Sequence, residues 1–441
     1  MKDTSYKWYL LGLLLLIQAF SSVDRLALGL LNQDIKLDLS LSDSEVGVLD
    51  GIAFALFYAT VGIPMARWAD RGNRVTIVTC TTALWSVAVA VCGAAHSFVQ
   101  LALNRVVVGI GEAGCVPVTN SMVPDRFGRA ERARAMSIIA LSSPLATVIG
   151  YGAAGWIGQH YGWRTTFLIL GLPGVPLAAL AAFTLREPRM DQGASVVADG
   201  GGQPVQLLSF WQTCTTLWRI ASFRHLTIAY VVALFFNFGI YQLLPMFFIR
   251  SYGMQTGELG GWLAVSNGVA GFAGTYLGGE LASRFARNNE PAQLKVMAII
   301  FAVTALLFAS VFVMPNKELA FGFMALFIIL GMTINGPMDA IKQSIVPERT
   351  RASSFALVSL LGNLIGMGLG PLAGGALSDL LHPMLGDESL RYALLILTPG
   401  YLWAAWHLWA ARTTVLQDVS RVESGSAGAP LEATATNALA H

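Results

Sequence analysis

The sequence predicts an all-α membrane protein with twelve transmembrane helices, arranged as two six-helix halves. Of its 441 residues, 55% are apolar and only 12% are charged, about half the charged share of an ordinary soluble domain. Nearly uncharged segments such as 75–95 and 296–314 recur along the chain, and a helix needs about 20 such residues to cross the hydrocarbon core. Backbone groups in that core find no water, so these segments must be helices.

The apolar segments divide the chain into twelve spans separated by short polar loops. The first span contains Asp24 and Arg25 and lacks a small-residue cleavage site, so we interpret it as a helix and not as a secretory signal peptide. The expected spans lie near residues 8–31, 45–66, 75–95, 98–122, 135–158, 163–185, 225–249, 259–283, 293–314, 318–342, 352–380 and 390–411.

The positions of Lys and Arg indicate the orientation, because cytoplasmic loops retain positive charge. With both termini inside, all but seven of the 28 Lys and Arg residues fall on the cytoplasmic side. We therefore expect a multi-pass integral protein of the bacterial inner (plasma) membrane with both termini in the cytoplasm. The seven exceptions are five residues on the outer side and two within spans, Arg25 and Arg105.

Between and after the halves the composition changes. We expect an N-terminal six-helix bundle over 1–186, a cytoplasmic linker over 187–208, a C-terminal six-helix bundle over 225–412 and a disordered cytoplasmic tail over 413–441. Residues 209–224 contain Trp211, Trp218 and Arg219, which favours a helix lying in the inner membrane interface. An early start of the seventh span is the alternative.

An internal repeat relates the two halves. Pro124-Asp125-Arg126 precedes the fifth span, and Pro347-Glu348-Arg349, about half the chain later, precedes the eleventh. Both copies fall on the cytoplasmic side, so the halves share one topology and are related by an axis along the membrane normal. This arrangement predicts two bundles that rock about a cleft between them.

Three motifs resemble those of the major facilitator superfamily. Residues 66–74, Ala-Arg-Trp-Ala-Asp-Arg-Gly-Asn-Arg, are similar to its signature loop between helices 2 and 3. Arg105 through Ala113 is similar to its Arg-xxx-Gly-x-Gly motif, and Gly162-Trp163-Arg164 opens the sixth span as it often does in that family. The resemblance covers essentially the whole chain and implies a secondary transporter that functions as a monomer.

Within the superfamily, the Asp24-Arg25 pair, Asn73 and the Gly111-Glu112-Ala113 run resemble the spinster-like branch. That branch includes exporters of sphingolipids and lysolipids, which implies an amphipathic substrate. The sequence departs from the superfamily pattern at Ala66, where the signature usually opens with Gly. The Gly-Pro-x-x-Gly-Gly element is poor in the fifth span, whereas the eleventh contains a glycine-rich run over 366–375.

In the first half, Asp24, Arg25, Arg105 and Glu112 are the ionisable residues that clearly lie in mid-membrane, where each must face a partner or water. Arg105 and Glu112 lie two turns apart on one helix face. Asp24 and Arg105 lie equally far below the outer ends of their helices, so an ion pair between them is expected. We interpret Asp24, Arg25, Arg105 and Glu112 as the proton-coupling group, with Glu112 the better candidate for protonation. The alternative is a fixed buried network that joins two helices.

The signature loop and the second half supply further candidates. Asp70, Arg71 and Arg74 lie at helix ends on the cytoplasmic side and are interpreted as a cytoplasmic gate. Ordinary surface charge is the alternative. Polar groups that could bind a substrate head group, or simply bond one another, are Asn237, Tyr241, Asn267, Asn335, Asp339 and Asn363. Aromatic residues around 235–248 are expected to form an apolar wall for an acyl chain, with the lipid-facing side as the alternative.

Other classes of function find little support. The six His and four Cys residues show no metal-ligand spacing, and neither a nucleophile triad nor a phosphate loop is visible. We therefore expect no enzyme activity, no cofactor and no bound metal. The net charge of +2 and the scattered basic residues argue against nucleic acid as a partner. The expected function is proton-coupled transport of an amphipathic organic or lysolipid-like substrate; a lipid scramblase, a non-transporting sensor, or a drug or organic anion transporter of the same fold are the alternatives.

Overall fold

A computed structural model describes residues 3–187, 210–285, 289–347 and 350–424. The predicted linker lies outside these residues except for Glu187, as does the tail beyond residue 424. Throughout the described part of the chain the regular structure is helical, without strands. The all-α fold class is therefore confirmed.

The first half consists of helices that join end to end into longer rods. The second span, for example, is α2 followed directly by α3, and the fourth is α5 followed by α6. In order, the elements are α1 (Asp3–Leu39), α2 (Asp43–Asp50), α3 (Ile52–Arg71), α4 (Arg74–Cys92), α5 (Phe98–Glu112), α6 (Cys115–Arg126), α7 (Arg129–Ala140), α8 (Ser142–Thr147), the π-helix η1 (Val148–Ala153), α9 (Ala154–Gly171) and α10 (Gly174–Thr184).

The second half repeats this plan. Its spans are formed by α13 (Ala221–Tyr241) with α14 (Leu244–Tyr252), α15 (Thr256–Phe285), α16 (Glu290–Val313), α17 (Lys317–Thr333) with α18 (Asn335–Ser344), α19 (Arg351–Leu361) with the π-helix η4 (Gly362–Met367) and α20 (Gly368–Leu385), and α21 (Ser389–Leu397) with α22 (Gly400–Ala411). A 3-10 turn, η5 (Gly386–Glu388), connects α20 to α21.

The internal repeat predicted from the sequence has two structural counterparts. The fifth span of each half contains a π-helix, η1 or η4, a local widening that is rare outside functional helices. The turn that follows each of these spans contains a glycine with positive φ, Gly162 (φ 79°) or Gly386 (φ 54°). Residues with a Cβ rarely adopt this conformation, so glycine is required at both turns.

The span count agrees with the prediction. Within the described residues, nine segments are long and apolar enough to cross a membrane. Two of these, Arg134–Thr184 and Ser353–Ala411, contain 51 and 59 residues and are each divided into two spans at Gly162 and Gly386. With α15, a helix of 30 residues, the described chain contains twelve spans.

Two short amphipathic helices lie at the ends of the second half. The helix α12 (Phe210–Arg219) is separated from α13 by extended backbone at Ile220, so the seventh span begins at Ala221 and α12 is not its early start. The helix α23 (Val415–Glu423) corrects the prediction of disorder from residue 413. Its Asp418 Oδ2 accepts a hydrogen bond from the Ser222 backbone N–H at 3.0 Å, which satisfies an amide at the start of α13.

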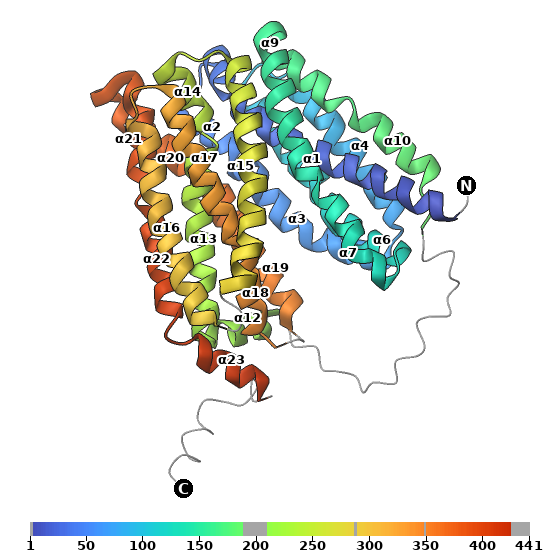
Figure 1. Cartoon of the computed structure of the whole chain (residues 1–441). Coiled ribbons are helices and arrows are strands. Elements are labelled where there is room, and N and C mark those ends of the chain that lie inside the picture. The colour runs from blue at the N-terminus through green and yellow to red at the C-terminus, as the bar shows by residue number, and fades with distance from the viewer. Residues whose placement is uncertain (1–2, 188–209, 286–288, 348–349, 425–441) are drawn as a thin grey trace.

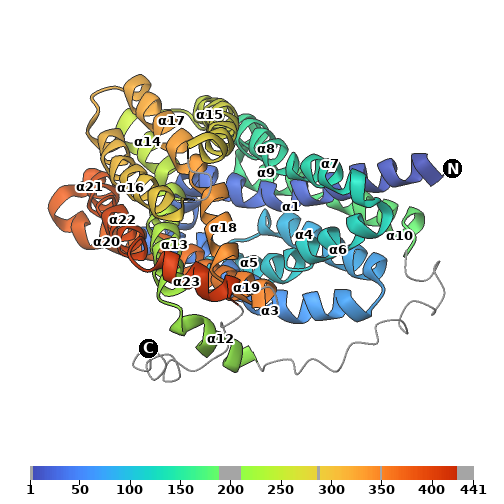
Figure 2. The same ribbon diagram turned by 60° about the horizontal axis from the view of Figure 1, so that its bottom comes forward.

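The helices α1–α10 form one bundle and α13–α22 form the other, as Figure 1 and Figure 2 show. The bundles meet where α2 packs on α20, α1 on α14, and α9 and η1 on α15. We call the region around the α2–α20 contact the closed end. Away from it, toward α6, α7, α18 and α19, the ribbons of the two bundles diverge (Figure 1).

Candidate functional site

The predicted ion pair between α1 and α5 is present. Arg105 Nη1 donates to Asp24 Oδ2 at 2.5 Å, and both side chains are buried. The two residues were inferred from the sequence to lie at equal depth in the membrane, and in the structure they are in contact. A buried pair of this kind joins the two helices, because removing either partner leaves an uncompensated charge.

Glu112 has a cationic partner that the sequence did not indicate. Arg25 Nη1 of α1 donates to Glu112 Oε2 of α5 and Arg25 Nη2 donates to Ser22 Oγ at 3.0 Å. The Glu112 side chain is only 2% exposed, whereas the Arg25 side chain is 26% exposed. The pair therefore has one buried member and one member that water or a solute can reach.

Phe54 of α3 connects the two pairs. The Cζ atoms of Arg25 and Arg105 lie 5.1 and 5.2 Å from its ring centroid, which is the range of cation–π attraction. Asp24 Oδ1, Glu112 Oε1 and Arg105 Nε nevertheless have no hydrogen-bond partner among the described residues. The four charged groups thus form one incompletely satisfied network.

Both bundles line a central cavity of about 530 Å³. The first half contributes Ser22, Arg25, Asp50 and Tyr151, and the second half contributes four of the six predicted substrate residues, namely Asn237, Tyr241, Asn267 and Asn335. Three of these four are already engaged: Tyr241 O–H donates to Asn267 Oδ1, and Asn237 Nδ2 donates to the Tyr401 hydroxyl at 3.1 Å.

The predicted aromatic wall is wrong in most of its members. Phe247 and Phe248 are fully buried in the core of the second half, where they pack on Phe312 and Phe321. Among the phenylalanines of that stretch, Phe238 alone lines the cavity. The apolar lining comes instead from other residues of the second half, namely Phe301, Phe327, Ile328, Met332, Met338 and Met367.

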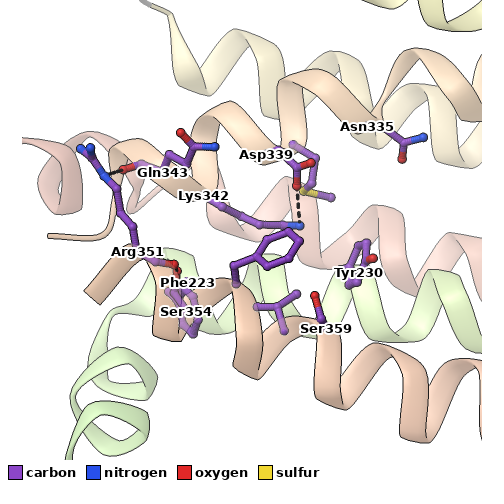
Figure 3. A pocket seen from close by; sticks show the side chains of 12 residues that line it. Phe223, Tyr230, Asn335, Asp339, Lys342, Gln343, Arg351, Ser354 and Ser359 are labelled. Carbon is purple, nitrogen blue, oxygen red and sulfur yellow. Dashed lines mark hydrogen bonds and ion pairs between the residues drawn. The ribbon is translucent and has the colours of Figure 1, made fainter. Parts of the chain in front are cut away.

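A second cavity of about 700 Å³ lies within the second half, between α13, α18 and α19. Figure 3 shows Lys342 of α18 extended toward Asp339, with an Nζ–Oδ1 distance of 3.1 Å. Its Nζ also lies 4.1 Å from the Tyr230 ring centroid. The predicted residue Asp339 therefore lines this cavity and not the central one, while Asn335 lines both. Asn363, on η4, lines neither cavity.

The closed end is held by charged groups that the sequence analysis missed. Arg250 donates to Asp43 at 2.9 and 2.7 Å and to Gln33 at 2.7 Å, across the two halves. Asp379 of α20 accepts hydrogen bonds from the backbone N–H groups of Asp43 and Ser44 at 3.0 and 2.8 Å. A carboxylate at a helix N-terminus interacts favourably with the helix dipole. No sequence signal linked these residues, which lie some 200 to 340 positions apart.

The predicted cytoplasmic gate is only partly described. Asp70 and Arg71 lie at the end of α3, and their side chains are outside the described part of the structure. Arg74 is fully buried and donates to Glu187, to Asp125 at 2.7 Å and to the Ser121 carbonyl at 3.0 Å. All of these partners belong to its own half, so in this conformation Arg74 fastens the ends of the first-half helices together.

Two six-helix bundles around a central cavity, with one closed end, define a transporter that exposes its site to each side of the membrane in turn. A sequence profile of the Major Facilitator Superfamily matches residues 14–371. The chain belongs to this superfamily, which is one of transporters and not of enzymes. It is therefore a multi-pass integral membrane protein that carries out secondary transport by alternating access.

Known proteins refine this assignment. An MFS-type efflux pump of Mycolicibacterium smegmatis is 32% identical over 418 residues, which cover 93% of this chain and 94% of the pump. A probable galactarate/D-glucarate transporter of Bacillus subtilis is 25% identical over 297 residues, 63% of this chain and 65% of that protein. The crystal structure of a bacterial homologue of the human lysosomal transporter Spinster, inward-facing and unoccupied, has a TM-score of 0.83 at 27% identity and covers 94% of this chain and 98% of that one. The spinster-like resemblance is confirmed.

Proposed function

We propose that the protein couples proton movement to the transport of an amphipathic organic substrate, and that Glu112 is the coupling group. The observation that carries this proposal is the Arg25–Glu112 pair, in which a buried carboxylate is held by a guanidinium that reaches the central cavity. Protonation of Glu112 removes the negative charge that holds Arg25. The guanidinium is then free to bind an anionic or polar group of the substrate.

The two pairs have different parts in this scheme. Asp24 and Arg105 are both buried and neutralise each other, so this pair stays ionised and intact while the neighbouring Arg25–Glu112 pair changes its charge. A fixed network throughout is the competing interpretation. A buried polar network that only stabilises is expected to pair each carboxylate with a cation or a donor, whereas here the Glu112 carboxyl group also lies against the Asp24 carboxyl group.

The lining of the central cavity supports an amphipathic substrate. Aromatic and methionine side chains such as Phe301, Phe327 and Met367 supply apolar surface, and Asn237 and Asn267 supply a few polar contacts. This combination is typical of sites for organic molecules with an apolar body. The efflux pump relative is consistent with it. Transport of an organic acid is the second candidate, because Arg25 could bind a carboxylate and a probable sugar-acid transporter is among the relatives.

From the distribution of positive charges, we propose that both termini lie in the cytoplasm of a bacterial cell and that the closed end lies outside. The central cavity then opens inward in this conformation. We further propose that Asp70 and Arg71, together with the helix ends fastened by Arg74, form the cytoplasmic gate of the opposite conformation. A single chain contains the whole cavity, which is consistent with a monomer as the functional unit.

Reconstituted vesicles with an imposed pH gradient test the coupling. The probes are a fluorescent lysophosphatidylcholine and radiolabelled D-glucarate, which separate the two substrate classes. We expect Glu112→Gln to retain binding but to lose gradient-driven uptake, because Gln keeps the shape of a neutral carboxyl group and cannot release a proton. Glu131→Gln is the matched control, since Glu131 pairs with Lys7 away from the cavity.

The outcome separates the competing functions. Parental rates and an unchanged gradient dependence in Glu112→Gln contradict the coupling role and favour the fixed network. Lipid movement that ignores the gradient in the parental protein indicates a scramblase. Absence of movement for every probe, with binding retained, indicates a sensor.

A further inference from the structure

Asp50 is a buried carboxylate that the coupling scheme above does not use. It is the last residue of α2, it is 3% exposed and it lines the central cavity. Its Oδ2 accepts a hydrogen bond from Asn32 Nδ2 at 2.5 Å. Its Oδ1 has no partner, and no ion pair joins Asp50 to a cation within the described parts of the chain.

The charged groups around Asp50 are committed elsewhere. From α5, Arg105 acts on Asp50 electrostatically, but its guanidinium donates to Asp24 of α1. From α20, Asp379 binds the opposite end of α2. Both of these charged groups therefore bond to partners other than Asp50.

The remaining titratable neighbours are tyrosines. Tyr151 of η1 interacts electrostatically with Asp50, and Tyr151 is bonded to Tyr241 of α13. From α3, Tyr58 stacks on Phe54 and interacts electrostatically with Arg25 and Glu112. These neutral phenols supply no positive charge to the buried Asp50 carboxyl group, and a buried charge without a partner is costly.

Asp50 also lies at the contact that must separate when the closed end opens. One turn before it, a Cβ on Gly47 would lie 2.4 Å from the Pro371 carbonyl oxygen of α20, and just after it a Cβ on Gly51 would lie 2.3 Å from the Gly368 oxygen. The backbones of α2 and α20 therefore touch on both sides of Asp50. Asn32 Nδ2, which binds Asp50, also lies 3.5 Å from the Gln242 carbonyl of the other half.

We propose that Asp50 is a second proton-binding site, which holds a proton while the α2–α20 contact is closed and releases it to the water that enters when this contact opens. The proton leaves from the carboxyl oxygen Oδ1 or Oδ2, and the carboxylate that remains is stabilised by hydration. Closure expels this water and requires the proton to return. Low pH thereby stabilises the closed end, independently of the Arg25–Glu112 pair.

The inference goes beyond the proposed function, because Asp50 controls the opening of one end and Glu112 controls the binding of substrate. The two can be tested separately. If Glu112→Gln does not alter transport, the coupling role of Glu112 is contradicted but the role of Asp50 at the closed end is not. If the experiment below gives a negative result, the role of Asp50 is contradicted but the coupling role of Glu112 is not.

The experiment measures the distance between the two halves at the closed end by pulsed electron resonance in lipid nanodiscs. Spin labels are attached at Leu37→Cys, at the end of α1, and Met384→Cys, at the end of α20, in a background without Cys80 and Cys214. Leu37 and Met384 are 68% and 83% exposed, so labels there do not disturb the contact. We expect the parental protein to show a growing long-distance population as the buffer is changed from acidic to alkaline.

Three variants identify the responsible group. Asp50→Asn, which keeps the hydrogen bond from Asn32 but cannot ionise, is expected to retain the short distance at every pH. Asp50→Glu, which restores a carboxyl group, is expected to recover the response. Asp38→Asn is the matched control, because Asp38 is an exposed carboxylate of the same end that pairs with Arg164 in its own half.

Several results overturn the proposal. One is a parental distance distribution that does not change with pH. Another is an Asp50→Asn variant that opens over the same pH range as the parental protein. A third is a response that disappears in Glu112→Gln and persists in Asp50→Asn, because it would assign the titration to Glu112.

Discussion

Replacement of Arg250 by Ala removes a bidentate charged connection between the halves at the closed end. The guanidinium makes two hydrogen bonds to Asp43, at 2.9 and 2.7 Å, and both side chains are largely buried. Asp43 keeps Lys36 and the Ser378 hydroxyl, which donates to it at 2.6 Å. The carboxylate therefore does not become unpaired, and the loss is smaller than for an isolated buried pair.

The magnitude follows from these contacts. A hydrogen bond to a charged group contributes about 1.5–3 kcal/mol, and we assign one such contribution to the bidentate pair because Asp43 retains two partners. These bonds exist only while α14 and α2 are together, so their loss destabilises the closed end and not the separate bundles. Since about 1.4 kcal/mol changes an equilibrium tenfold, Arg250→Ala should raise the ratio of open to closed molecules by about 10- to 100-fold.

The spin-label pair at Leu37 and Met384 measures this ratio directly. A double-mutant cycle with Asp43→Asn supplies the control, because two residues that act through one contact have non-additive effects. The reasoning is refuted if Arg250→Ala leaves the distance distribution unchanged, or if the two substitutions add without coupling. Unequal unfolding temperatures of the variants would indicate damage within a bundle, so thermal unfolding in detergent accompanies the measurement.

Two further predictions concern packing and burial. Gly51→Ala should prevent full closure, because its Cβ would lie 2.3 Å from a carbonyl oxygen of α20. Gly12→Ala is the control and should have no effect, because a Cβ there would have nothing within 4 Å. Transport rates that respond equally to both changes contradict this prediction. Glu187→Ala should lower the stability of the first half by about 3 kcal/mol, because it removes the main partner of the fully buried Arg74. A thermal unfolding midpoint in detergent that matches the parental value counts against this estimate.

The sequence alone determined the fold class and the topology of the chain. Length and apolarity are properties of each segment by itself, and a bilayer admits only helices there, so twelve spans follow without tertiary information. The repeat around Pro124 and Pro347 related the two halves, because a repeat can be recognised by comparing segments of the sequence without knowing their contacts. The Asp24–Arg105 pair was also predictable, because depth within a helix can be counted from its end.

Tertiary structure decided which residues meet across segments. Glu112 lacked a cation in its own helix, and only the packing of α1 on the first bundle brings Arg25 to it. The contacts of Asp43 with Arg250, and of α2 with Asp379, depend on the conformation that closes one end. The aromatic stretch around residues 235–248 does not show from its sequence whether a side chain faces the protein core or the cavity. Phe247 and Phe248 were therefore assigned to the cavity wall, although both are buried in the core.

Asp50 and α23 illustrate the same limit. The sequence analysis did not select Asp50, because its burial depends on backbone contact between α2 and α20 at Gly47 and Gly51. The composition around 415–423 resembled a disordered tail, yet a helix forms because α13 and α16 cover its apolar face and Ser222 binds its Asp418. Local sequence determines which secondary structure a segment can form. Burial and pairing contribute free energy only once distant segments have come into contact, so they depend on the tertiary structure.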